Sequence, residues 1–70
     1  MFENKKIHMI GIGGISMSGI AQILLDHKAI VSGSDAQEGN TIDMLRKLGI
    51  NVQIGHHPEM INDADLVVYT

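Results

Sequence analysis

The residues best suited to chemistry lie in the glycine-rich stretch GIGGISMSGIA, residues 11–21. In the dinucleotide fingerprint G-x-G-x-x-G, Gly11 and Gly13 take the first two glycine positions. Ser16 takes the third, and an additional Gly14 follows the second. A loop of this kind can hold a diphosphate at a helix N-terminus, or it can simply make a tight turn between a strand and a helix. The stretch leaves both interpretations open.

A diphosphate bound by this loop would need no lysine. Glycines let the backbone approach a phosphate, and the first turn of a helix offers free N–H groups together with about half a positive charge from its dipole. The expected donors are the N–H groups of Gly14, Ile15, Ser16 and Met17, with the Ser16 hydroxyl as an additional donor. Ser16 weakens the NAD form of the motif, because a glycine at that position permits close packing of helix on strand.

Two polar groups farther along the chain are candidates for the same site. Asp35 follows the loop at close to the usual spacing of about 20 residues for a nucleotide-binding acid. It can accept hydrogen bonds from a ribose hydroxyl or from N3–H of a uracil ring, or it can be a turn residue or helix cap. His56 can lie at the edge of a nucleotide pocket if the strand order permits, whereas His57 is expected to be a solvated loop residue. The two adjacent histidines have no metal-ligand spacing, and the chain has no cysteine, so we predict no metal site.

Alternating strand and helix patterns surround these residues. A nearly continuous apolar run from Lys6 to Ile12 predicts a buried strand, and the helix after it should extend to about His27. A second strand from Ala29 ends at Ser32-Gly33-Ser34-Asp35 and so delivers Asp35 at its carboxyl end. The predicted core face of the first helix comprises Met17, Ile20, Ala21, Leu24 and Leu25.

The second half of the chain repeats this alternation. Asn40 or Thr41 should cap a second helix that ends at Gly49-Ile50, with Ile42, Leu45 and Leu48 as its apolar face. Residues 51–54 and 66–69 read as strands, with a short helix starting at Pro58 between them. The order predicts an α/β fold, a Rossmann-like three-layer domain whose mostly parallel sheet of about four strands has helices on both faces. Because the chain stops on a hydrophobic strand, we expect a piece of a longer protein whose free edge favours self-association.

Composition narrows the class of protein. Seventy residues suffice for one small domain, 1–70, and a formal net charge of −3 argues against nucleic-acid binding. The absence of cysteine fits a reducing cytoplasm, and no apolar run approaches the length of about 20 residues that spans a membrane. With no tryptophan, one phenylalanine and one tyrosine, stacking on aromatic side chains is not expected to recognise a ligand.

The segments together resemble a known family. Five segments of the chain resemble the amino-terminal domain of the Mur ligases, and among them the family of UDP-N-acetylmuramate–L-alanine ligases, in order and spacing. These segments are HMIGIGGISMSGIAQILL, VSGSD, TIDMLRKLGI, IGHHPEMI and DLVVYT. The resemblance spans residues 7–70, and GIGGxxMSGIA combined with SGSD and IGH is far more specific than a glycine motif alone. Ligases that add a tripeptide to the same nucleotide sugar have a similar layout but a glycine loop that departs further from GIGG.

The resemblance implies a domain that binds the UDP part of UDP-N-acetylmuramate. Ser34 and Asp35 would lie at the uridine, and His56 would lie near it. The pyrophosphate would be held by the loop residues Gly11, Gly13, Gly14, Ile15, Ser16 and Met17.

The resemblance also implies that the parent protein is an ATP-dependent ligase of peptidoglycan (cell wall) biosynthesis in the cytoplasm. Such enzymes activate the muramate carboxylate as an acyl phosphate with Mg²⁺ and join L-alanine to it, using a GKT/S-type loop in a central domain and a third domain for alanine. This sequence contains no Gly-Lys pair, so the 70 residues are expected to recognise UDP without catalysing. Two other classes stay open: the NAD(P)-binding half of an oxidoreductase, and a regulatory module that binds a nucleotide or a partner.

Overall fold

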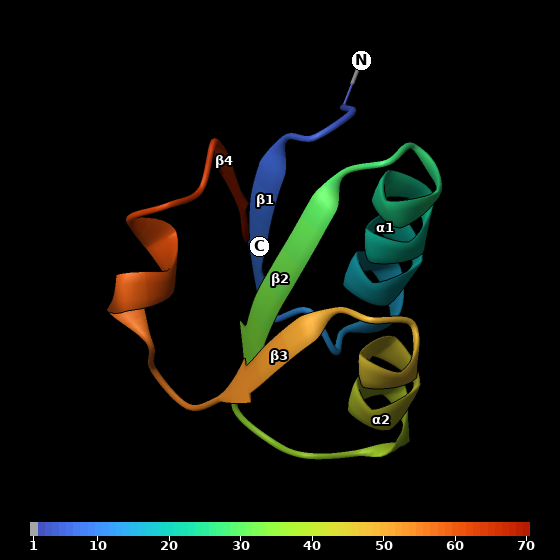
Figure 1. The fold of residues 1–70 in the computed structure, drawn as a ribbon. Helices are drawn as coiled ribbons and strands as arrows, with labels where there is room; N and C mark the ends of the chain where they lie inside the picture. The colour runs from blue at the N-terminus through green and yellow to red at the C-terminus, as the bar shows by residue number, and fades with distance from the viewer. Residues whose placement is uncertain (1) are drawn as a thin grey trace.

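The computed structural model describes residues 2–70, which form four strands, two α-helices and one 3-10 helix (Figure 1). In chain order the elements are β1 Lys6–Ile10, α1 Ile15–Asp26, β2 Ile30–Asp35, α2 Asn40–Lys47, β3 Asn51–Ile54, η1 Pro58–Ile61 and β4 Leu66–Val68. Every predicted element is present, which confirms the α/β class. The strand β1 stops at Ile10, two residues before the predicted apolar run ends at Ile12. The strand β2 ends at Asp35, as predicted.

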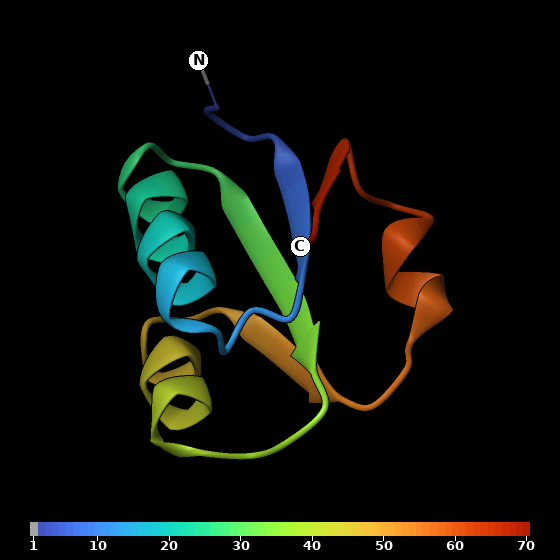
Figure 2. The ribbon, with the colours of Figure 1, turned by 180° about the vertical axis from the view of Figure 1, so that it is seen from behind.

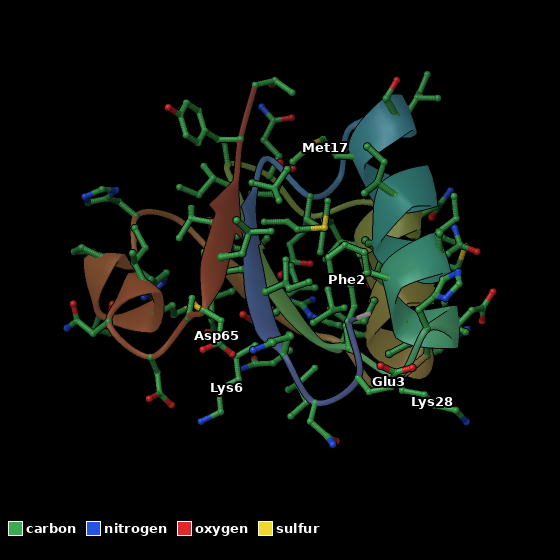
Figure 3. The ribbon with its side chains drawn as sticks, turned by 90° about the horizontal axis from the view of Figure 1, so that it is seen from above. Phe2, Glu3, Lys6, Met17, Lys28 and Asp65 are labelled. Carbon is green, nitrogen blue, oxygen red and sulfur yellow. The ribbon has the colours of Figure 1, made fainter. Side chains whose placement is uncertain are left out.

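The four strands of the described chain form a parallel sheet in the order β3-β2-β1-β4. Both α1 and α2 cover one face of this sheet, and η1 lies on the opposite side, as Figure 2 shows from behind. The view from above in Figure 3 shows the same three layers. The predicted three-layer arrangement is therefore confirmed, although the second face carries only one short helix.

The core lies between the sheet and the two α-helices. Ile7 and Met9 of β1 lie in it, and Figure 3 shows Met17 between α1 and the sheet. The other buried apolar residues are Ile12, Ala21, Leu24, Ala29, Val31, Ile42, Leu45, Ile50 and Val52. The predictions for Ile20 and Leu48 are wrong, since they are 42% and 46% exposed. Ile20 belongs to a helix that is apolar on more sides than the sheet can cover, and Leu48 is the residue after the last turn of α2.

The prediction for the N-terminus of α2 is wrong, and the prediction for its C-terminus is confirmed. Gly39 is its N-cap and no side chain bonds to the free N–H groups there, so the predicted capping by Asn40 or Thr41 is wrong. The C-terminus follows the prediction, with Gly49 at φ +94°. The N–H of Ile50 donates to the Leu45 carbonyl at 3.2 Å, and the Gly49 N–H donates to the Arg46 carbonyl at 3.0 Å. These two bonds define a Schellman motif.

The C-terminus of α1 makes the same motif without a glycine. Lys28 has φ +69°, and the N–H of Ala29 donates to the Leu24 carbonyl at 3.1 Å. We expect Lys28→Gly to stabilise the protein by about 0.5–1 kcal/mol, because relief of the left-handed strain exceeds the entropy cost of glycine. Denaturant unfolding measures the change. Lys47→Gly, inside the last turn of α2, should destabilise by a similar amount, and a loss of stability in both variants would contradict the strain argument.

The strand β4 lies at the edge of the sheet. It pairs with β1 alone in the described chain, with Leu66 opposite Ile7 and Val68 opposite Met9. Leu66 is 48% exposed and Tyr69, just after the strand, is 72% exposed. Within residues 2–70, no helix has the length and apolar character needed to cross a bilayer.

Candidate functional site

The strand order creates a switch point at β1. From β1 the chain proceeds on one side to β2 and β3, and it then crosses the sheet to place β4 on the other side of β1. In open α/β sheets, ligands bind at the carboxyl ends of the strands where the order reverses in this way. The glycine loop follows β1 directly and so lies at this position.

The loop is fixed to the end of β2. The N–H groups of Gly11 and Ile12 both donate to the Ser34 carbonyl, at 2.8 and 3.1 Å. Gly11 has φ +79°, a conformation that disfavours any side chain, and Ile12 turns into the core with no exposed surface. The loop is therefore held before any ligand arrives.

The N-terminus of α1 presents its donors outward from this loop. Gly14 is the N-cap, with no side-chain cap bond and no acidic residue in the first turn. The N–H groups of Ile15, Ser16 and Met17 have no acceptor within the helix. The Gly14 N–H was expected to be a fourth donor to the ligand, but it donates to the Gly11 carbonyl at 3.1 Å instead. Three backbone donors and the exposed Ser16 side chain are left for an anion.

Asp35 connects the loop to the carboxyl end of β2. Its Oδ2 accepts a hydrogen bond from the Gly13 N–H at 2.8 Å, and its Oδ1 accepts one from the Gln37 N–H at 3.3 Å. Gly13 is required for this approach, since a Cβ there would lie 2.8 Å from Oδ2. The sequence anticipated the position of Asp35 but not this bond. A carboxylate has about four acceptor sites, so it retains capacity for a ligand.

Two hollows flank Asp35. The larger, of about 540 Å³, lies between the carboxyl ends of β1, β2 and β3 and the helix η1. Its lining residues are His8, Ile10, Gly11, Ser34, Asp35, Ala36, Gly55, His56, His57, Pro58 and Ile61. The smaller, of about 210 Å³, lies beside the start of α2, and its lining includes Asp35 and Gly13 of the glycine loop. The structure thus brings together the predicted Ser34, Asp35 and His56 around one cavity.

His57 differs from its prediction as a solvated residue. Its Nε2 donates to the Ile54 carbonyl at 2.8 Å, and its Nδ1 lies 3.3 Å from Glu59 Oε1. Both nitrogens are donors only in the protonated ring, so first the Ile54 carbonyl and then Glu59 raise the pKa of His57. His57 therefore anchors the loop that carries His56, and its type and spacing in the sequence gave no signal of this.

The opposite shift occurs at His8, whose pKa is lowered by burial. A raised histidine pKa adds stability below its unfolded value of 6.5, and this is lost as the pH rises through the folded value. A lowered histidine pKa adds stability at pH values above the unfolded pKa of 6.5, and this stability is lost as the pH falls through the folded pKa. We therefore expect His57→Gln to lower the melting temperature more at about pH 5.5 than at about pH 8, and His8→Gln to do the reverse. Thermal unfolding of both variants tests this, and equal losses at the two pH values would contradict it.

No group of three His, Cys, Asp or Glu side chains in the described residues has the arrangement of a metal site. The sequence also lacks a Gly-Lys pair. The Gly-Lys pair of the GKT/S-type loop expected for ATP is therefore not in this chain, and no chemical step is assigned to its residues.

Among known proteins, the chain is similar in sequence to UDP-N-acetylmuramate–L-alanine ligases. The chain is 57% identical over 68 residues to the UDP-N-acetylmuramate–L-alanine ligase of Clostridium beijerinckii. This match covers 97% of the chain and 15% of the relative. It is 54% identical over 66 residues to the ligase of the same name from Aquifex aeolicus, covering 94% of the chain and 14% of the relative. The chain therefore spans about one seventh of the length of these relatives.

Solved structures share the fold. The UDP-N-acetylmuramate–alanine ligase of Thermotoga maritima superposes with a TM-score of 0.85 at 41% identity, covering 91% of this chain and 15% of that one. A murein peptide ligase from Psychrobacter arcticus gives a TM-score of 0.86 at 28% identity, covering 94% and 14%. The family model described as "Mur ligase family, catalytic domain" matches residues 6–70. With nearly the whole chain matched and a glycine loop at the switch point of the sheet, the chain belongs to the Mur ligase family.

Proposed function

We propose that this chain is the UDP-N-acetylmuramate-recognition domain of an ATP-dependent ligase that adds L-alanine to that nucleotide in peptidoglycan biosynthesis. The observation that carries the proposal is the open N-terminus of α1, whose three N–H groups have no acceptor in the helix, together with a cavity of about 540 Å³ that Gly11 of the same loop lines. The names of the similar proteins, at 57% and 54% identity, support the choice of nucleotide.

In this proposal each part of the site has one task. The pyrophosphate accepts hydrogen bonds from the N–H groups of Ile15, Ser16 and Met17, and the α1 dipole favours its negative charge. The nucleoside occupies the larger cavity, with Ser34, Asp35 and His56 at its wall. The remaining glycines, Gly11, Gly13 and Gly14, shape the loop rather than donate to the ligand.

The parent enzyme would act in the cytoplasm and would bind ATP, Mg²⁺ and L-alanine outside these residues. The 70-residue chain would bind UDP without catalysis. Self-association through the free edge of β4 stays a prediction.

Amide chemical shifts of the labelled chain test the nucleotide class. Titration with UDP-N-acetylmuramate or UDP should shift the amides of residues 13–17, whereas NAD should leave them unchanged at the same concentrations. Shifts with NAD and none with UDP would overturn the proposal in favour of an oxidoreductase half.

A substitution at Ile15 tests the backbone donors directly. Proline is tolerated at the first position of a helix, and Gly14 before it has the extended ψ of 153° that a residue preceding proline requires. Ile15→Pro therefore removes one N–H while α1 persists, and we expect UDP to bind about tenfold more weakly. Ile15→Ala is the matched control, because the side chain is 95% exposed and the N–H is retained. Equal affinities for the two variants would exclude the Ile15 N–H as a ligand contact.

A further inference from the structure

His8 is a buried polar residue that the proposed function leaves without a role. It lies in the middle of β1, is 1% exposed, and lies opposite Ser32 in the sheet register. Its Nδ1 lies 2.9 Å from Ser32 Oγ. One side of the imidazole is thus held in place by a neighbouring strand.

The other ring nitrogen, Nε2, is not bonded within the protein. His8 is part of the lining of that cavity, and the structure records no protein partner for its Nε2. Among residues 2–70, every buried side-chain nitrogen or oxygen has a hydrogen-bond partner. The Nε2 atom is therefore not fully buried, in a residue that lines the larger cavity.

The surroundings of this nitrogen suit a flat heterocycle. Ile10, Pro58 and Ile61 supply apolar wall, and Ser34 and Asp35 lie nearer the glycine loop. A planar base can slide between apolar walls while its polar edge meets a single fixed group at the bottom.

We propose that His8 Nε2 hydrogen-bonds the edge of the uracil ring of the bound nucleotide. This inference rests on the proposed function, because it presumes that a uridine nucleotide enters the cavity. Burial lowers the pKa of His8 and so favours the neutral ring. The Ser32 hydroxyl can donate to Nδ1 or accept from it, so Nε2 can present either a proton to a uracil carbonyl or a lone pair to N3–H.

Ring nitrogen shifts of the wild-type chain provide the direct test. With histidine side chains labelled with ¹⁵N, UDP should move the His8 Nε2 resonance together with the amides of residues 13–17. Pyrophosphate, which lacks the base, should move those amides and leave His8 unchanged. If UDP moves the amides and not His8, this inference is wrong and the proposed function survives. If UDP moves neither, both are overturned.

Three variants provide a second test by calorimetry. An asparagine amide reaches the place of Nδ1 and a glutamine amide that of Nε2, so His8→Asn should lose about tenfold in UDP affinity and His8→Gln should retain most of it. Ser32→Ala leaves Nε2 in place and should lose less than His8→Asn. Equal UDP affinity in folded His8→Asn and wild type would overturn the inference. If His8→Asn does not fold, the ring shifts of the wild type decide.

Discussion

Replacing Gly33 with alanine is expected to destabilise the domain by about 2–3 kcal/mol, among the largest effects of a single methyl group in this protein. A Cβ at this position would lie 2.5 Å from Cδ1, 2.8 Å from Cβ and 2.9 Å from Cγ2 of Ile12. Ile12 has no exposed surface and its own N–H is bonded to the Ser34 carbonyl, so its backbone has little room to yield. Denaturant unfolding measures the change.

Gly19→Ala is the matched control for Gly33→Ala. Gly19 lies inside α1, and a Cβ there meets nothing within 4 Å. Alanine should therefore stabilise the helix by about 0.5–1 kcal/mol, opposite in sign to the change at Gly33. A stability within about 0.5 kcal/mol of wild type for Gly33→Ala would show that the loop and β2 separate easily, contrary to the close packing described above.

Replacing Asp35 with alanine is expected to weaken UDP binding by about 10- to 100-fold while the fold persists. The carboxylate holds the Gly13 N–H at 2.8 Å, so its loss frees the loop that presents the α1 donors, and it also removes an acceptor from the cavity wall. Calorimetric titration with UDP measures the affinity, and thermal unfolding checks the fold.

Asp35→Asn separates the two roles of this carboxylate. The amide oxygen can still accept from the Gly13 N–H, whereas the amide nitrogen cannot accept from a ligand. Near-wild-type affinity of Asp35→Asn would assign the residue to the loop alone, and affinity as low as that of Asp35→Ala would assign it to the ligand. An unfolded Asp35→Ala, or one that binds UDP like wild type, would contradict the prediction.

The two kinds of helix-end prediction fared differently for a physical reason. The C-cap at Gly49 was predictable because a left-handed residue followed by an apolar one is a local pattern that needs no distant contact. The N-cap was not, because Gly39, Asn40 and Thr41 are all acceptable there and the path of the chain from Asp35 decides among them. Ile20 was wrongly assigned to the core because periodicity cannot tell which part of a broadly apolar helix the sheet will cover.

The candidate site shows the same division. The glycine loop could be found from its spacing, and the structure adds that Gly14 donates within the loop while Ile15, Ser16 and Met17 remain open. His8 and His57 could not be found, because a histidine in a strand or loop has no pattern of its own. Their roles arise from Ser32, the Ile54 carbonyl and the cavity, which the fold brings to them.

The sequence by itself determined the order of strands and helices and the glycine turn after β1, because both follow from the character of neighbouring residues. Only the tertiary structure decided that β4 lies beside β1, which makes β1 the switch point, and that Asp35 Oδ2 meets the Gly13 N–H. These contacts join residues far apart along the chain, and their formation depends on the pairing and crossover of whole strands. The glycine loop, Ser34, Asp35 and His56 could thus be named from the sequence as candidates, whereas their contacts with one another depend on the sheet.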